Sequence, residues 1–291
     1  MCFAKYLSIT KPYALLLLLL LLLSGSYKKR GIYDHLSWPE REKLSMEYYR
    51  KGFAEVEFHQ GSVVQRQLYD TAIMINPNNA EAWFEKGSWN IKIGDYVTYF
   101  KLMNKAVELN PRVYMGWRGS IKLYVLKDYQ DAIQDIEGHA AFFPGVTTYP
   151  RGENANYLIG LAKKQQGNYE QAIIYFNKCA DEIIKERGEK WVDVRLFVYR
   201  GIARMHLQQY GEAISDFDIA LRNYDKIPEA YYHKALALHK LGKSAAVCQN
   251  LNKAMTTAGQ GYIYKDVIDQ LYLSDIAQAQ DCWCQAKEKN N

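Results

Sequence analysis

Apolar residues recur along most of the chain with the three-to-four-residue spacing of an amphipathic helix. Between residues 45 and 257 they form stretches of about 12 residues that come in twos around short breaks. Such breaks are "GDY" at 94–96, "GNY" at 167–169 and "LGK" at 241–243. Because glycine and polar residues favour turns, the pattern predicts an all-α chain of helix–turn–helix units.

These units recur at a regular period. The segments "AIMINP", "AVELNP" and "GHAAFFP" end at Pro77, Pro111 and Pro144, so the spacings are 34 and 33 residues. One helix pair cannot bury its apolar face alone, and repeated pairs therefore have to stack on one another.

The repeated segments resemble the tetratricopeptide repeat (TPR), a 34-residue unit with the pattern W-x2-L-G-x2-Y…A-x3-F…P. Six copies cover residues 45–257, and each keeps small or aromatic residues of that pattern. They are Gly52, Tyr69, Ala72 and Pro77; Trp83, Gly87, Ala106 and Pro111; Ala132 and Pro144; Gly160, Ala172 and Phe176; Phe197, Gly201, Ala213, Phe217 and Ala220; and Tyr231, Ala235, Leu251 and Ala254. The resemblance implies a right-handed superhelical solenoid of about six repeats with a C-terminal capping helix.

The departures from the pattern are local. An insertion, residues 145–154, follows the third copy, and residues 181–194 are expected to extend the second helix of the fourth. Insertions in repeat proteins gather on one face, often the binding face, although simple loop growth is the alternative. In the third copy Ser120 replaces glycine and His139 replaces alanine, so this copy fits worst.

The end of the chain does not repeat. Ser274 is expected to cap a helix that starts at Asp275. Its apolar stripe, Ile276, Ala279, Trp283 and Ala286, suits a capping helix with one face for the last repeat and one for water. The predicted organisation is a leader at 1–26, a linker or cap at 27–44, the repeats at 45–257 and capping helices at 258–291.

The leader contains an apolar run of 11 residues, Tyr13–Leu23. A membrane-spanning helix needs about 20, whereas a secretory signal core has about 7–15. Cleavage is expected between Ser26 and Tyr27. The segment "LLSGS" resembles a bacterial lipobox, but Ser26 stands where the lipid-bearing cysteine would be. We therefore expect export to the periplasm or cell envelope, and a short membrane anchor is the alternative because Lys28–Arg30 oppose translocation.

Charge and titratable residues offer little chemistry. The net charge of +5 is scattered along the chain, which argues for a solvated surface and against a nucleic-acid footprint. The six histidines lack the spacing of a helical zinc site. The acid pairs Asp131/Asp135 and Asp216/Asp218 are expected on solvated faces of second helices. No catalytic residue, cofactor or metal is predicted.

The cysteines divide into two kinds. Cys179 stands where the repeat has alanine, so we expect a small core residue. Cys248, Cys282 and Cys284 cluster near the C-terminus. In an oxidising compartment Cys248 is expected to pair with Cys282 or Cys284 and hold the cap in place. A metal site is the weaker interpretation because a fourth ligand with suitable spacing is missing.

The resemblance also implies a peptide-binding groove, because TPR first helices expose their second, fifth, ninth and twelfth positions to a bound segment. Those positions include Tyr49, Phe53, Phe84, Tyr114, Trp117, Tyr124, Tyr157 and Tyr232, with Lys164 and Arg195 beside them. The aromatic rings favour anchoring of apolar or extended segments, and several of them packing between repeats is the alternative. The TPR clamp for a carboxyl-terminal carboxylate is not expected.

These observations predict a non-catalytic scaffold that binds a protein or peptide segment in the cell envelope. Two alternatives stay open. One is a helical-repeat module that binds nucleic acid, and the other is a spacer subunit of a larger envelope complex.

Overall fold

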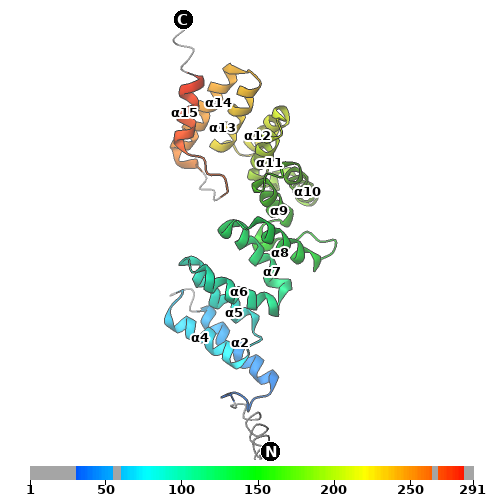
Figure 1. The fold of residues 1–291 in the computed structure, drawn as a ribbon, viewed down its shortest axis with the longest axis vertical. Coiled ribbons are helices and arrows are strands. Elements are labelled where there is room, and N and C mark those ends of the chain that lie inside the picture. The colour runs from blue at the N-terminus through cyan, green and yellow to red at the C-terminus, as the bar shows by residue number, and fades with distance from the viewer. Residues whose placement is uncertain (1–30, 55–59, 264–267, 285–291) are drawn as a thin grey trace, which may run out of the picture. The chain divides into compact units, whose positions relative to one another are not determined.

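The computed structural model describes residues 31–54, 60–263 and 268–284, and the predicted leader, with Ser26 and Tyr27, lies outside them. The described residues form 13 α-helices without a strand, which confirms the all-α prediction (Figure 1). The chain divides into two compact units, residues 1–99 and 100–291. Among the described helices, none has the length and apolarity needed to cross a membrane.

The first unit contains α2 (Trp38–Ala54), α4 (Val63–Ile75) and α5 (Ala80–Lys92). Helix α2 packs against α4, and α4 packs against α5. Helix α2 begins inside the segment 27–44 that was expected as a linker or cap, because Glu40 accepts hydrogen bonds from the Ser37 backbone N–H and hydroxyl. Helix α6 (Tyr96–Leu109) crosses the boundary between the units.

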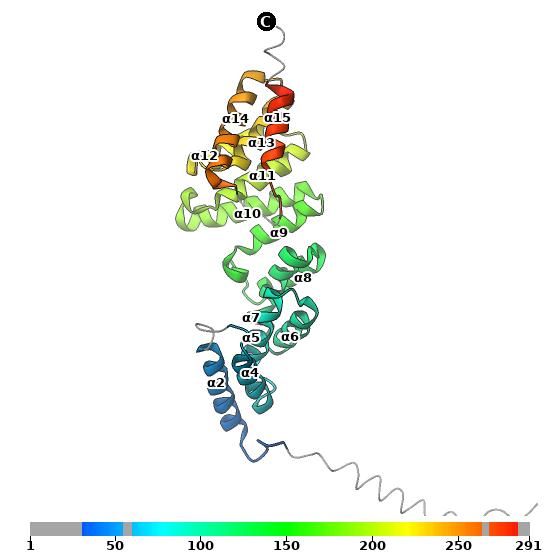
Figure 2. The ribbon, with the colours of Figure 1, turned by 90° about the vertical axis from the view of Figure 1, so that its left-hand side faces the viewer.

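The second unit is a series of packed helix pairs. They are α7 (Pro111–Ile121) with α8 (Tyr129–Ala141), α9 (Ala155–Gln165) with α10 (Tyr169–Arg187), α11 (Val194–His206) with α12 (Tyr210–Asn223), and α13 (Pro228–Lys240) with α14 (Ser244–Thr257). Each second helix also contacts the next first helix, so the pairs stack in sequence order (Figures 1 and 2). Helix α10 continues past residue 180 as predicted, but it ends at Arg187 rather than 194, because Gly188 at a φ of 95° breaks it and a 3-10 turn, Glu189–Trp191, follows. A π-helical turn, Lys122–Leu126, prolongs α7.

Contact between the two helices of a pair depends on glycine. A Cβ atom on Gly201 would lie 2.6 Å from the Phe217 ring, and one on Gly160 would lie 2.7 Å from the Phe176 ring. Both rings are fully buried. Since real Cβ atoms do not approach other atoms so closely, only glycine allows the ring to lie flat on the neighbouring backbone. These are the small and aromatic positions that the repeat pattern predicted.

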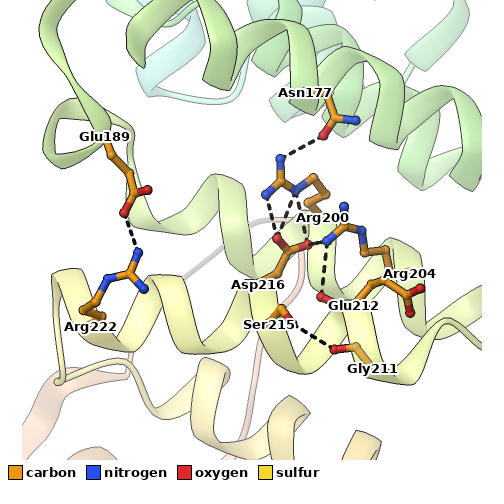
Figure 3. A network of polar contacts seen from close by, with 9 residues as sticks. All are labelled: Asn177, Glu189, Arg200, Arg204, Gly211, Glu212, Ser215, Asp216 and Arg222. Carbon is orange, nitrogen blue, oxygen red and sulfur yellow. Dashed lines mark hydrogen bonds and ion pairs between the residues drawn. The ribbon is translucent and has the colours of Figure 1, made fainter.

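Of the four aspartates expected on solvated faces, Asp135 and Asp216 lie in the interior, so the prediction is wrong for these two. Asp216 is fully buried and accepts hydrogen bonds from Arg200 at 2.6 Å and Arg204 at 2.8 Å. Arg200 also donates to Asn177 of the preceding pair at 2.8 Å (Figure 3). The burial has a physical reason: the carboxylate lies opposite two guanidinium groups, which compensate the loss of water.

The same arrangement occurs in the third copy. Asp135, which is 6% exposed, accepts from Arg118 at 2.6 Å, and Arg118 donates to Asn104 at 2.9 Å. Asp131 and Asp218 are exposed, as expected. In both copies one arginine of a first helix therefore joins three consecutive helices.

The C-terminal helix α15 (Leu273–Trp283) packs against α14 (Figure 2). Ile276 and Ala279 are buried, and Trp283 stacks on His239 with the ring centroids 4.1 Å apart. The predicted cap residue is wrong. The helix starts at Leu273 rather than Asp275, and the Asp275 carboxylate accepts from the Tyr272 backbone N–H at 3.0 Å.

A disulfide joins Cys248 of α14 to Cys284, and Cys282 is exposed and unpaired. The Cα atoms lie 5.6 Å apart and the linked residues are 36 positions apart. Closing a loop of that size contributes roughly 3–4 kcal/mol in the chain-entropy model. Cys179 is buried, as expected, and burial raises the pKa of its thiol to about 12.

Gly201→Ala tests the close contact between paired helices. The added Cβ collides with the Phe217 ring, so we expect the free energy of unfolding to fall by about 1–3 kcal/mol in urea titrations. Gly211→Ala in α12 is the matched control, because nothing lies within 4 Å of its Cβ position. This control should gain a few tenths to about 1 kcal/mol. If both substitutions changed the free energy of unfolding by the same amount, the contact between Gly201 and Phe217 would not determine stability.

Candidate functional site

We call the side of the second unit formed by α7, α9, α11 and α13 the first-helix face. Helix α11 contacts both α9 and α13 on this face. Three cavities of about 250, 520 and 440 Å³ lie along it. The first two share Asp193 and Arg195, and the last two share Ile202, His233 and Asp269. The shared residues show that the three cavities are neighbours in a series, which suits an extended ligand.

The central cavity, of about 520 Å³, is lined mostly by apolar and aromatic side chains. Helix α11 contributes Val198, Tyr199 and Ile202, which share one face at helical spacing. Tyr262 and Ile263, which follow α14, close the opposite side. Such a lining provides a concave apolar surface with a few polar groups, which is typical of ligand sites.

The polar groups of the central cavity are partly paired with one another. Arg195 binds the Asp193 carboxylate through its side chain, with Nε 3.0 Å from both oxygens. The Lys226 ammonium donates to the Tyr262 hydroxyl at 3.0 Å. These pairs satisfy part of the charge of the lining, to which Glu229 and Asp269 also contribute.

The cavity of about 250 Å³ lies between the insertion and the extension of α10. Tyr149, Gly152 and Glu153 of the insertion line one side, and Trp191 lines the other. Trp191 is 67% exposed, so its indole ring is available to a ligand. The 3-10 turn Glu189–Trp191, between α10 and α11, therefore places a large aromatic side chain at the edge of the face.

The cavity of about 440 Å³ is closed by residues 268–272, which we call the C-terminal strap. Ile268, Asp269 and Leu271 of the strap line the cavity opposite Tyr232 and His206. Asp269 forms an ion pair with Lys164 at the end of α9. Together with burial, its charge raises the pKa of the Tyr129 hydroxyl. A segment from the C-terminus thus crosses the face and reaches α9.

The insertion covers part of α7. The Arg151 guanidinium lies over the Trp117 ring, 5.3 Å from its centroid, and Glu153 accepts a hydrogen bond from the Tyr124 hydroxyl at 2.9 Å. Arg151 has a φ of 53°, a left-handed conformation that costs energy for a non-glycine residue. The third copy thus holds its own insertion against the two rings predicted to bind a partner.

The eight predicted groove residues are divided between the two units. Tyr49, Phe53 and Phe84 lie in the first unit and the other five in the second. Tyr114 and Tyr157 are buried, and Tyr157 packs between Phe176 and Tyr199. Tyr157 packs inside the fold because its ring contacts rings of α10 and α11. Trp117 is 37% exposed, and Tyr232 lines the cavity of about 440 Å³.

Several residues of the site were not predicted from the sequence. They are Trp191, Val198, Tyr199, His233, Tyr262 and the C-terminal strap. Lys164 and Arg195 were predicted, and both lie on the face. The strap carries no repeat pattern, so its position on the face had no signal in the sequence.

His233 lies between the central cavity and the cavity of about 440 Å³. Its ring packs on Phe217 and against the edge of Tyr232. The surrounding protein lowers the pKa of His233 to about 4, mainly through burial, so the ring is neutral near pH 7. Among the described residues, no group of three or more His, Cys, Asp and Glu side chains has the arrangement of a metal site.

Comparisons with known proteins agree with the fold. Residues 153–182 and 200–246 match family models of the tetratricopeptide repeat. The fold is similar to that of PilW, a type IV pilus biogenesis factor, with 14% identity, a TM-score of 0.55 and coverage of 82% of this chain and 97% of PilW. PilF from Pseudomonas aeruginosa has 13% identity and a TM-score of 0.54, and the match covers 74% of this chain and 91% of PilF. YrrB, described as a TPR protein with an unusual peptide-binding site, has 16% identity and a TM-score of 0.51, and the match covers 65% of this chain and 91% of YrrB. No curated protein sequence gives a significant match.

The low pKa of His233 predicts a pH dependence of stability. The unfolded chain takes up a proton at this residue near pH 6.5, whereas the folded chain does so only near pH 4. The unfolded state therefore binds more protons as the pH falls from 6.5 to 4, and the free energy of unfolding should fall by at most about 3 kcal/mol.

Urea titrations of the wild type and of His233→Gln across this pH range measure the effect. The wild type should lose its advantage in the free energy of unfolding over His233→Gln as the pH falls, because the variant lacks the titrating group. Exposed His35 supplies the control. The free energy of unfolding of His35→Gln should change with pH in the same way as that of the wild type. Parallel curves for His233→Gln and the wild type would contradict the prediction.

Proposed function

We propose that this tetratricopeptide-repeat protein is a non-catalytic scaffold that holds an extended segment of another protein along its first-helix face. The observation that carries the proposal is the series of three neighbouring cavities that share lining residues. A segment that follows this series would meet α9, α11 and α13 in turn.

The chemistry of the face supports a peptide as the ligand. Exposed Trp191 and half-exposed Tyr262 offer rings at the cavity edges, and aromatic anchors contribute most of the binding energy in many interfaces. The mostly apolar lining accepts side chains, and its charged groups orient them. YrrB, a TPR protein of similar fold, has a peptide-binding site, and this is consistent with a peptide as ligand here.

We further propose that the chain works in the cell envelope. The support is the 11-residue apolar run of the leader and the Cys248–Cys284 disulfide, which persists in an oxidising compartment. The fold is similar to that of PilW, a type IV pilus biogenesis factor. A short membrane anchor is the competing interpretation of the leader.

Chemical analysis of protein isolated from the envelope without reductant tests this location. The amino terminus should be Tyr27, and mass mapping should find Cys248 joined to Cys284 with Cys282 free. Intact Met1 in the membrane fraction would instead support an anchor. Free thiols at all three positions would reject the oxidising compartment.

A library of displayed random peptides tests the binding function. Selection uses the full chain in two forms, the wild type and Asp269→Ala, which removes the strap carboxylate from two of the cavities. Selected peptides should bind Trp191→Ala at least about tenfold more weakly, because an exposed aromatic anchor contributes about 2 kcal/mol. The melting temperature of this variant should stay close to that of the wild type.

Two further tryptophan variants complete the test. Trp38 is 60% exposed on α2 in the first unit, so Trp38→Ala is the size-matched control and should keep full affinity. Trp117→Ala shows whether the ligand extends to α7. It should weaken binding if the ring contacts the ligand, or cost about 3–5 kcal/mol of stability if the ring is a packing residue. Failure of both chains to select peptides, or equal losses for Trp38→Ala and Trp191→Ala, would reject the proposal.

A further inference from the structure

The C-terminal strap already occupies the first-helix face in the way a bound peptide would. It lies between the π-helical turn Ala258–Tyr262 and α15, but its contacts reach α9, more than one hundred positions earlier in the chain. The Gln165 side-chain amide lies 3.4 Å from the Ile268 carbonyl oxygen and 3.3 Å from the Asp269 carboxylate. The strap backbone is irregular, and Tyr272 at its end is extended.

Lys164 determines which charge this part of the face accepts. Only 5% of its surface is exposed, and its ammonium group lies 5.4 Å from the centroid of the Tyr199 ring. Within the described residues, the ion pair of Lys164 is formed with Asp269. A buried ammonium without a counter-charge is strongly destabilising, so any segment that covers Lys164 has to bring a carboxylate to it.

The neighbours of Asp269 insert into apolar surroundings. Ile268 packs against the core that α8 to α12 share, and Leu271 is buried in the core of α13, α14 and α15. The strap therefore presents an acidic side chain with an aliphatic residue directly before it and another two positions after it. Each of these three side chains has its own site on the protein.

The cap around the strap shares the core that holds Leu271, but it also has anchors of its own. The turn Ala258–Tyr262 packs on α14, and α15 is joined to α14 through the Cys248–Cys284 disulfide. Gly261, at a φ of 88°, adopts a left-handed conformation inside this turn. Displacement of residues 268–271 therefore leaves the cap in place. It also keeps the strap near the face at an effective concentration in the range of about 1 mM.

We propose that residues 268–271 are an intramolecular ligand, and that the partner is an extended protein segment with an acidic residue between aliphatic residues, which displaces them at Lys164 and Gln165. This inference rests on the proposed peptide-binding function and names the chemistry of the segment. The strap then lowers the affinity of the free protein for its partner, and only a segment of matching chemistry replaces it.

A labelled peptide with the sequence of residues 268–272, Ile-Asp-Gln-Leu-Tyr, blocked at both ends, is the probe. Asp269→Ala in the full, oxidised chain removes the charge that holds the strap at Lys164. We expect this variant to bind the probe at least about tenfold more tightly than the wild type does, because the competing carboxylate is gone.

Three controls separate recognition from general loosening. Asp181→Ala removes an exposed acid from α10 and should bind as the wild type does. A probe with asparagine in place of aspartate should bind Asp269→Ala at least about tenfold more weakly, because it leaves Lys164 without a counter-charge. Lys164→Gln in the Asp269→Ala chain should abolish the preference for the acidic probe.

Hydrogen exchange on the wild type provides a second measurement that needs no variant to fold. Excess probe should remove the protection of residues 268–271 and leave that of α15 unchanged. The proposal is overturned if Asp269→Ala binds no better than the wild type, if the two probes bind equally, or if the strap stays protected while the probe is bound.

The outcome also distinguishes this inference from the proposed function. One outcome is that the selected peptides depend on Trp191 but lack acidic residues and resist displacement by the probe. That result would reject the intramolecular ligand and leave the proposed scaffold function standing. Failure of both chains to select any peptide would reject the scaffold itself.

Discussion

The close contact between a glycine of one helix and an aromatic ring of its partner is the constraint on which the stack depends. Gly201 under Phe217 and Gly160 under Phe176 bring the paired helices together until ring and backbone touch. Such packing gives each pair a rigid shape, and a rigid pair presents the same side of its first helix each time it stacks on the next. The first-helix face and its cavities follow from that regularity.

Polar interactions add a second connection between pairs. Arg200 joins Asn177 of the preceding pair to buried Asp216, and Arg118 joins Asn104 to Asp135 in the same way. A buried carboxylate between two cationic groups, Arg200 and Arg204 at Asp216 or Arg118 and Lys122 at Asp135, is stable only while all partners are in place. These networks therefore favour one relative position of consecutive helices. Apolar contacts alone tolerate sliding, whereas a bidentate pair does not.

Two segments that depart from the repeat cover the face. The insertion holds Arg151 over Trp117, and the C-terminal strap holds Asp269 at Lys164. Between them lies the central cavity, with a mostly apolar lining. A binding surface covered by its own chain stays soluble and avoids unspecific association, since large exposed apolar patches promote aggregation. Under the proposed function, the ligand has to offer better contacts than the covering segment does.

The sequence by itself determined the helix pairs, their period, the glycine and aromatic positions and the extension of α10, because these features depend on residues close together in the chain. Only the tertiary structure decided which cysteine pairs with Cys248, that Asp216 is buried, and that Tyr157 packs inside while Trp191 stays exposed. It also placed Asp269 at Lys164. Each of these outcomes depends on groups from helices that pack together only after folding, and local periodicity carries no information about which groups will meet there.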